Sequence, residues 1–350
     1  MTERAPIKAL AMLSGGLDSS LAVHLIKEQG IEVEAVNFHT GFCLTDAHRA
    51  LGQTANRHGT PYRNEALRAG AHERVPVRVV DVSRDYLPVV TQPRYGYGSA
   101  MNPCIDCRIF MLRRARTLME EIGARFVFTG EVLGQRPMTQ HLRALQLIER
   151  EAGLEGLVLR PLSAQLLPPT IPEQEGWVDR ARLLDISGRS RRAQMELAER
   201  FQIGEYPQPA GGCCSLVDAN FARRLRDLYA HRDPAGVLPE EYVMLKLGRH
   251  LRLGPGLKII VGRNEGENRF LELWRGSRWL LSTPDHPGPL SLLDGEPDEE
   301  QLLECARIAA RYCDGKKEGR VRVLASRREA ESRELLVEPR GEYELASRLL

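Results

Sequence analysis

The order of apolar and polar positions predicts strands that alternate with helices in the N-terminal part of the chain. Residues 7–13 form a short apolar run typical of a buried strand, and apolar residues then recur at helical spacing up to Gly30. Further strands are predicted at 31–38, 75–82, 125–130 and 156–160, and further helices at 44–58, 105–122, 138–151 and 189–202. This alternation predicts an α/β fold with a doubly wound parallel sheet.

The pattern changes after about residue 215 and predicts a second, smaller α+β domain. A helix is expected at 218–231, before a turn with Pro234 and Pro239. Two strand candidates, 257–264 and 269–282, are joined by a polar turn at 264–268, and a helix at 298–313 and a strand at 320–325 follow. The expected limits are 1–216 for the first domain, 217–240 for a linker helix and turn, 241–327 for the second domain and 328–350 for a charged, loosely ordered tail.

Composition indicates a globular protein without a strong overall charge. Of 350 residues, 42% are hydrophobic and 27% are charged, and the formal net charge is +2. No global field therefore attracts nucleic acid, and an RNA site must be a local basic patch. Two arginine groups are candidates, with solvated helix faces as the alternative: Arg108, Arg113, Arg114 and Arg116, and Arg180, Arg182, Arg189, Arg191 and Arg192.

The cysteines point to metal or redox chemistry in a reducing compartment. The N-terminus is charged, and no segment reaches the roughly 18 apolar residues of a membrane span, so we expect a cytoplasmic protein with no membrane partner. Seven cysteines in that compartment argue against a disulfide framework. Cys104 and Cys107 form a CxxC pair, and Cys213 and Cys214 are adjacent.

A strand-turn-helix at 8–29 carries a candidate anion site. Two glycines let the backbone approach an anion, the following helix presents free N–H groups, and the serine hydroxyls add donors. Asp18 suits Mg²⁺ coordination or bracing of the loop. The loop is not a Walker A loop, and the alternative is a sharp turn with no ligand. Its residues are Ser14, Gly15, Gly16, Leu17, Asp18, Ser19 and Ser20.

The sequence SGGLDSS resembles the signature of the N-type ATP pyrophosphatases, the PP-loop family with a HUP-like fold. The resemblance implies that ATP and Mg²⁺ are cofactors and that residues 14–20 bind ATP. It also implies cleavage of ATP between the α- and β-phosphates and activation of a carbonyl oxygen as its adenylate. Phe38 and its neighbours are expected to line the adenine pocket.

A second segment narrows the family. Residues 129–135 (TGEVLGQ), followed by Thr139 and Gln140, resemble a stretch of the tRNA 4-thiouridine synthetases, the thiI family, as does LRPL at 159–162. The resemblance covers about residues 7–215 and places Gly130 and Gln135 in the ATP site. Glu131 and Gln135 are expected to bind substrate or brace Mg²⁺, the alternative being a polar helix start. The THUMP domain and the rhodanese-like domain found in that family are not expected here.

The cysteines fit this resemblance. A CxxC at 104–107 and a distant cysteine after a Gly-rich turn resemble the three-cysteine site of tRNA thiolases that hold a [4Fe–4S] cluster. The resemblance implies Cys104, Cys107 and Cys213 as ligands, and an open iron that carries sulfide. Three alternatives to the cluster stay open: catalytic persulfide chemistry on Cys107 and Cys213, a structural zinc site, and an incidental grouping of cysteines. Cys214 is an alternative ligand, Cys43 could approach the site, and Cys305 and Cys313 are expected in a core.

The C-terminal unit resembles the RNA-binding domain of the NFACT proteins over about residues 245–325. Basic residues there are expected to contact phosphates, and Trp274 and Trp279 to stack on bases. The alternative is buried tryptophans and solvated arginines. The candidate phosphate contacts are Arg249, His250, Arg252, Lys258, Arg263 and Asn264.

These resemblances imply an adenylating tRNA sulfurtransferase, a transferase for tRNA modification. A uridine carbonyl would be adenylated, with catalytic Asp18, and sulfur would displace AMP. The TGE segment favours 4-thiouridine. The expected partners are tRNA and a sulfur donor, either sulfide or a cysteine desulfurase, and a homodimer is left open. The rival hypotheses are 2-thiouridine synthesis, an amide-forming PP-loop enzyme acting on a small molecule, and a non-catalytic RNA quality-control protein.

Overall fold

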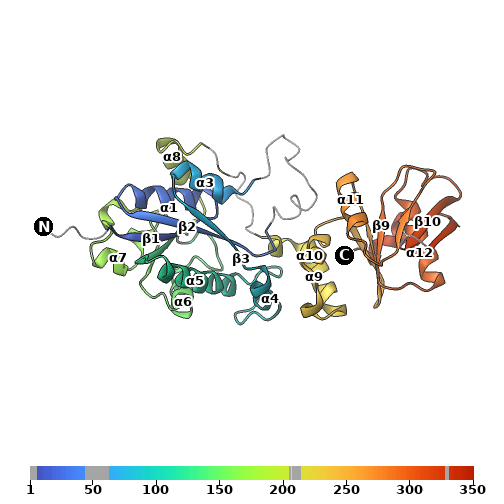
Figure 1. The fold of residues 1–350 in the computed structure, drawn as a ribbon, viewed down its shortest axis with the longest axis horizontal. Helices are drawn as coiled ribbons and strands as arrows, with labels where there is room; N and C mark the ends of the chain where they lie inside the picture. The colour runs from blue at the N-terminus through green and yellow to red at the C-terminus, as the bar shows by residue number, and fades with distance from the viewer. Residues whose placement is uncertain (1–5, 44–62, 205, 207–213, 328–330) are drawn as a thin grey trace. The chain divides into compact units, whose positions relative to one another are not determined.

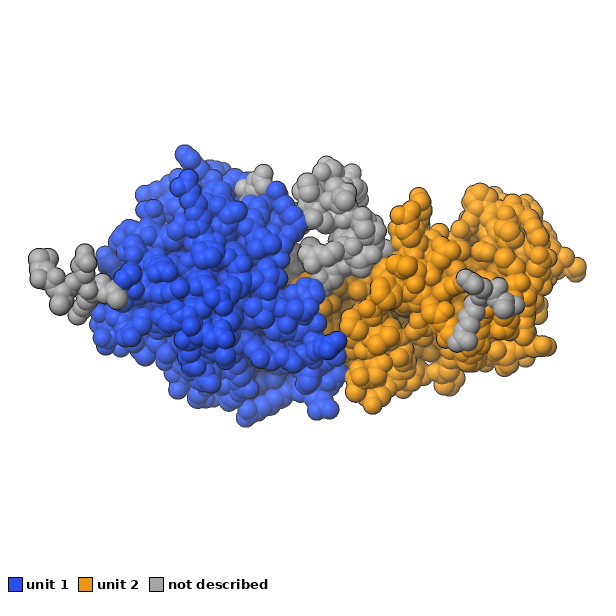
Figure 2. All heavy atoms as spheres, in the orientation of Figure 1, with its two compact units in different colours: residues 1–40, 63–213 blue, residues 41–62, 214–350 orange. Residues whose placement is uncertain are grey.

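The structure, a computed structural model, describes residues 6–43, 63–204, 206, 214–327 and 331–350. The chain forms two compact units, residues 1–40 with 63–213 and residues 41–62 with 214–350 (Figure 2). The helix expected at 44–58 lies outside the described residues. Within the described ranges, no helix combines the length and apolar character that crossing a membrane requires.

The first unit contains a five-stranded parallel sheet with helices on both faces, which confirms the predicted fold class (Figure 1). The strand order is β3-β2-β1-β4-β5. The strands are β1 (Lys8–Met12), β2 (Glu32–His39), β3 (Val77–Asp81), β4 (Phe126–Thr129) and β5 (Val158–Leu159). The helices are α1 (Leu17–Lys27), α3 (Glu65–Glu73), α4 (Ser83–Thr91), α5 (Cys104–Glu121), α6 (Leu142–Ala152), α7 (Ile171–Gln174) and α8 (Arg192–Arg200).

Alternate residues of β1 pack into the two layers. Ala9 and Ala11 contact the core beneath α1 and α3, whereas Leu10 contacts the core beneath α5 and α6. The chain builds β1, β2 and β3 outward in one direction and then returns to place β4 on the other side of β1. The strand order therefore reverses at β1 and β4, and in such sheets ligands bind in a crevice at the carboxyl ends of the strands at this point.

The second unit contains a six-stranded antiparallel sheet with the order β11-β10-β8-β9-β7-β6. One face packs against α12, and the other packs against α10 and α11. The strands are β6 (Arg249–Gly254), β7 (Leu257–Val261), β8 (Leu280–Ser282), β9 (Ser291–Asp294), β10 (Val321–Arg327) and β11 (Glu331–Val337). The helices are α9 (Ala219–His231), α10 (Pro239–Met244), α11 (Glu265–Leu273), α12 (Glu299–Arg311) and α13 (Glu342–Leu345).

Two expectations for this unit were wrong. Glu265–Leu273 is a helix and not a turn that leads into a strand. The side chain of Asn264 accepts a hydrogen bond from the Glu267 amide (3.0 Å) and so caps it. Residues 331–337, expected in a loosely ordered tail, form β11 and pair with β10. Whether the domain limits themselves hold stays a prediction.

Candidate active site

The serine-rich loop follows β1 directly and satisfies several of its own polar groups. The hydroxyls of Ser19 and Ser20 donate to the Gly16 carbonyl (2.9 and 3.2 Å), and the Ser20 amide donates to the same oxygen. The exposed Ser14 hydroxyl lies 3.1 Å from that of Ser19. The Leu17 side chain is buried in a cluster with Leu21 and Leu25, so only its backbone can contact a ligand.

Two glycines are required by close packing of backbone on backbone. Gly15 has φ +78°, and a Cβ there would lie 2.2 Å from the carbonyl carbon of Glu65, at the start of α3. A Cβ on Gly130 would lie 2.4 Å from the carbonyl carbon of Asp18 and from the amide nitrogen of Ser19. The loop at 14–20 is therefore held between the start of α3 and the segment after β4.

Asp18 is a half-buried residue with one carboxylate oxygen that is buried and unsatisfied. Its Oδ2 accepts a hydrogen bond from Gln135 Nε2 (3.0 Å), whereas Oδ1 is buried and has no hydrogen-bond partner among the described residues. Burial raises the pKa of the Asp18 carboxyl, although the Gln135 bond and two nearby arginines oppose this. An unpartnered carboxylate oxygen beside the serine-rich loop fits a hard cation such as Mg²⁺.

Glu131 braces the fold in the structure. It is 5% exposed; its Oε2 lies 3.1 Å from Arg160 Nε, and its Oε1 lies 3.3 Å from Arg108 Nε. Burial by itself raises the pKa of Glu131, but the two guanidinium groups outweigh it and leave the pKa lowered. Thr129 also donates to Oε2 (3.2 Å). The carboxylate expected to bind substrate or Mg²⁺ is thus surrounded by donors of the protein.

The CxxC pair occupies the first turn of α5. Asn102 Nδ2 donates to Cys104 Sγ (3.1 Å), and Cys107 lies one turn along the same helix. Asp106 accepts from the amides of residues 94 and 95 (2.9 and 3.0 Å), which ties the preceding loop to the helix start. Arg108, the next residue after Cys107, forms the ion pair with Glu131. The Arg108–Glu131 ion pair therefore connects α5, the cysteine helix, to the segment that follows β4.

The full predicted ligand set is not brought together by the described part of the chain. Cys213 lies outside the described residues, so its role stays a prediction. Within the described ranges no group of three or more His, Cys, Asp or Glu side chains could hold a metal ion. Cys305 and Cys313 are core residues, as expected, and burial raises the pKa of the Cys305 thiol to about 12.

Phe38 lies near the end of β2 and Gln135 follows β4, and neither lines the two cavities described among the placed residues. Phe38 is half-buried near the end of β2 and packs toward the α5 layer. A cavity of about 370 Å³ lies instead at the sheet edge, between α6, β5 and α7, and includes no residue of 14–20. The adenine position stays a prediction.

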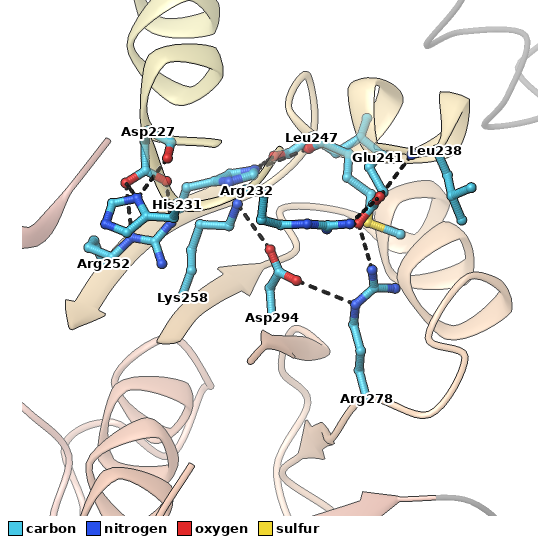
Figure 3. A network of polar contacts seen from close by, with 12 residues as sticks. Asp227, His231, Arg232, Leu238, Glu241, Leu247, Arg252, Lys258, Arg278 and Asp294 are labelled. Carbon is cyan, nitrogen blue, oxygen red and sulfur yellow. Dashed lines mark hydrogen bonds and ion pairs between the residues drawn. The ribbon is translucent and has the colours of Figure 1, made fainter. Parts of the chain in front are cut away.

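Two of the six candidate phosphate contacts, Arg252 and Lys258, are held in polar networks around β6 and β7 (Figure 3). Arg252 Nε donates to Asp227 Oδ1 (2.9 Å), and a second nitrogen of Arg252 contacts Oδ2. Lys258 is 2% exposed, and its ammonium lies 3.2 Å from Asp294. Because these charges are neutralised inside the fold, they are poorly placed to bind an RNA backbone.

Two of the other candidates, Arg263 and Arg249, are more accessible. Arg263 pairs with Glu267 in the next turn (Nε–Oε1 3.0 Å), and its side chain is 44% exposed. The Arg249 guanidinium lies over the Tyr312 ring, 5.0 Å from its centroid. Of the tryptophans, Trp279 is buried and Trp274 is 39% exposed, so only Trp274 is open to stacking.

His250, also considered a phosphate contact, makes the stability of the second unit depend on pH. It is fully buried, and its Nε2 lies 3.1 and 3.0 Å from the Met244 and Leu247 carbonyls. Burial lowers the pKa of His250 well below its usual range. The unfolded chain takes up a proton below about pH 6.5 and the folded chain does not, so unfolding becomes easier by up to ~1.4 kcal/mol per pH unit below that value.

Denaturant unfolding at pH 7.5, 6.5 and 5.5 checks this. Above pH 6.5 the His250 contribution is fully present, and the loss below it should be smaller in His250→Gln. Equal slopes in the two proteins would contradict a neutral, buried imidazole.

Comparisons with known proteins match the two units to different families. Residues 5–165 match the model described as Thiamine biosynthesis protein (ThiI). Residues 248–348 match that of the NFACT protein RNA binding domain. In a crystal structure of a 4-thiouridine synthetase–RNA complex with bound ATP, the similar chain is 27% identical. The match covers 45% of this chain and 37% of that one, with a TM-score of 0.32.

Curated relatives include two classes of tRNA-thiolating protein. A probable tRNA sulfurtransferase of Lysinibacillus sphaericus is 28% identical over 60% of this chain and 42% of its own length. One from Ureaplasma urealyticum is 31% identical over 44% and 36%. A tRNA-specific 2-thiouridylase MnmA of Nitrobacter winogradskyi is 28% identical over 39% and 34%. The chain spans less than half the length of these relatives. Residues 5–165 are therefore similar to the ThiI family, and residues 248–348 are similar to the RNA-binding domain of NFACT proteins.

Proposed function

We propose that the chain is an ATP-dependent tRNA sulfurtransferase that forms 4-thiouridine. The observation that carries the proposal is the crevice at β1 and β4. There an anion-binding loop lies beside the unpartnered Asp18 oxygen, and Glu131 and Arg108 connect this crevice to the cysteine helix. The ThiI-family model and the relatives named as tRNA sulfurtransferases support the same chemistry.

The reaction proceeds in two group transfers. The uridine carbonyl oxygen attacks the α-phosphorus of ATP, and the α–β bond breaks with release of pyrophosphate. A sulfur nucleophile then attacks the ring carbon, and the C–O bond breaks with departure of AMP, which carries away the original oxygen. The backbone N–H groups at the start of α1 stabilise the phosphates, and Mg²⁺ held by Asp18 would neutralise the departing pyrophosphate.

The sulfur-carrying group is the least constrained part of the proposal. Cys104 and Cys107 share one helical turn, which suits two thiolate ligands of a [4Fe–4S] cluster with Cys213 as the third. A persulfide on Cys107 or Cys213 is the alternative. Sulfide or a cysteine desulfurase would supply the sulfur in the cluster version. In the persulfide version the donor would be a cysteine desulfurase, whose own persulfide passes its outer sulfur to the cysteine thiolate, because free sulfide is too reduced to form a persulfide.

A basic groove in the first unit supports RNA as the substrate. It lies between α5 and the end of α6, holds about 500 Å³, and is lined by four arginines and one glutamate, a net charge of +3. The α5 arginines also donate to the last carbonyls of α6, for example Arg113 Nε to Glu151 O (2.9 Å). This groove and the NFACT-type domain offer phosphate-binding surfaces in both units. The lining residues with charge are Arg113, Arg114, Arg116, Arg150 and Glu151.

The test is an anaerobic reaction of the full chain with unmodified tRNA, ATP and Mg²⁺, run once with sulfide and once with a cysteine desulfurase and cysteine as the sulfur donor. Pyrophosphate release that requires tRNA, with a matching amount of 4-thiouridine by mass spectrometry of nucleosides, is expected. The 2-thiouridine isomer would overturn the choice of position. Pyrophosphate without any thionucleoside would favour the amide-forming rival, and RNA binding without pyrophosphate release would favour a non-catalytic RNA-binding protein.

A further inference from the structure

A segment far along the chain completes the wall of the crevice. Residues 186–191 run beside the segment that follows β4, where the Gly188 amide donates to the Leu133 carbonyl (2.7 Å) and the Ile186 amide to the Leu162 carbonyl (2.9 Å). Leu133 and Ser187 also form a parallel bridge. Helix α8 begins at residue 192, directly after this anchored segment.

Helix α8 runs alongside α1 in the same direction. At the ends of the two helices, the rings of His24 and Phe201 have centroids 4.3 Å apart. At their starts, the Arg191 charge acts on the Asp18 carboxyl. The starts of both helices, each a positive dipole end, therefore lie next to each other at the serine-rich loop.

Three side chains at these two helix starts carry buried polar atoms without a partner among the described residues. Gln194, on the first turn of α8, is 0% exposed, and neither its amide oxygen nor its amide nitrogen is hydrogen-bonded. Arg191 Nε and Asp18 Oδ1 are also buried and without a hydrogen-bond partner. Such atoms cost ~1–3 kcal/mol each in a folded protein unless something satisfies them. Four such atoms, on three side chains at the starts of two packed helices, point to a ligand.

The charges around Asp18 indicate what kind of ligand this is. Arg191 and Arg136 are near enough to Asp18 to influence its carboxyl, yet within the described residues neither forms an ion pair with it. A carboxylate under the influence of two guanidinium groups that form no ion pair with it leaves a place for a group that binds both kinds of charge. A Mg²⁺-bound polyphosphate has this character, because its oxygens bind arginine and its metal binds carboxylate.

We propose that Arg191 and Gln194 bind the β- and γ-phosphates of the nucleotide, and hence the pyrophosphate that leaves, opposite the loop at 14–20. Arg191 donates from its guanidinium, and Gln194 donates from its amide nitrogen. The reaction in which pyrophosphate leaves rests on the proposed function, whereas the binding of pyrophosphate does not. An adenine ring contacted by the Gln194 amide would be the alternative use of the same atoms.

The experiment measures binding of Mg²⁺-pyrophosphate and, separately, of adenosine to the full chain by calorimetry. Arg191→Ala and Gln194→Met are expected to weaken pyrophosphate binding by ~10–100-fold and ~3–10-fold, respectively, with adenosine unchanged. Arg191→Lys, which keeps the charge but loses the planar donors, should lie in between. Arg192→Ala is the matched control, since this neighbour is 87% exposed and pairs with Glu196 on its own helix (2.9 Å).

A structural role predicts a different pattern. If Gln194 only maintained the fold, Gln194→Met would lower thermal stability and leave pyrophosphate affinity unchanged. Because the amide is unsatisfied without ligand, we expect its removal to maintain or raise the melting temperature. Unchanged pyrophosphate affinity in Arg191→Ala, a loss of adenosine affinity instead, or no pyrophosphate binding to the unaltered chain would each overturn the proposal. If the chain bound pyrophosphate but never thiolated tRNA, the proposal for Arg191 and Gln194 would stand, and only the proposed function would be contradicted.

Discussion

Gly130→Ala should remove most of the tRNA-dependent release of pyrophosphate. The added Cβ would lie 2.4 Å from backbone atoms of Asp18 and Ser19, neither of which can rotate away. The segment after β4 must therefore shift against the start of α1, and the Gln135–Asp18 hydrogen bond (3.0 Å) would be lost. A misplacement of about 1 Å in a positioned site costs on the order of 100-fold in rate. We expect kcat/KM for pyrophosphate release to fall by at least that factor.

The comparison variant is Gly204→Ala in the same unit, where the added Cβ would meet nothing within 4 Å. Circular dichroism of both variants separates a local shift from unfolding. Gly130→Ala with at least half of the original rate would show that the contact between these backbones does not matter for the reaction.

Cys104→Ser should abolish thiolation while leaving the first half of the reaction largely intact. Serine is close to cysteine in shape and can still accept the hydrogen bond that Asn102 Nδ2 makes to Sγ (3.1 Å). It cannot replace a thiolate in binding iron or in carrying sulfur. We expect the yield of thionucleoside to fall at least ~100-fold. The rate of tRNA-dependent pyrophosphate release should stay within a few-fold of the original, because the serine-rich loop at 14–20 is unchanged.

The control is Cys313→Ser, in which the hydroxyl can keep the bond that the thiol makes to the Ala310 carbonyl (3.2 Å). Iron and sulfide analysis after anaerobic purification tells which sulfur chemistry was lost. About four irons in the unaltered chain and none in Cys104→Ser would indicate the cluster. No iron, with thiolation still dependent on Cys107, would indicate a persulfide. Normal thiolation by Cys104→Ser would remove this cysteine from the mechanism.

Most of the first unit could be predicted from the sequence because its elements are locally encoded. Parallel strands buried on both faces are continuous apolar runs, and their helices carry a clear apolar stripe, so β1, α1 and α5 appear close to their predicted limits. In the second unit, α11 was misread because its apolar residues continue into the strand at Leu280. Strand β11 was missed because it lies at the sheet edge and is largely exposed, which leaves little alternation to detect.

The sequence by itself determined much of the order of the elements, the glycine- and serine-rich loop at the strand switch and the cysteine pair at a helix start. Those features depend on periodicity and on residues a few positions apart. Only the tertiary structure decided that Glu131 pairs with Arg108 and Arg160, that Lys258 is buried on Asp294, and that Gly130 must lack a side chain. The charge of Arg191 acts on Asp18, far away in the sequence, because α8 packs along α1. The neighbours of a charged group are set by how distant elements pack, and no local pattern records that.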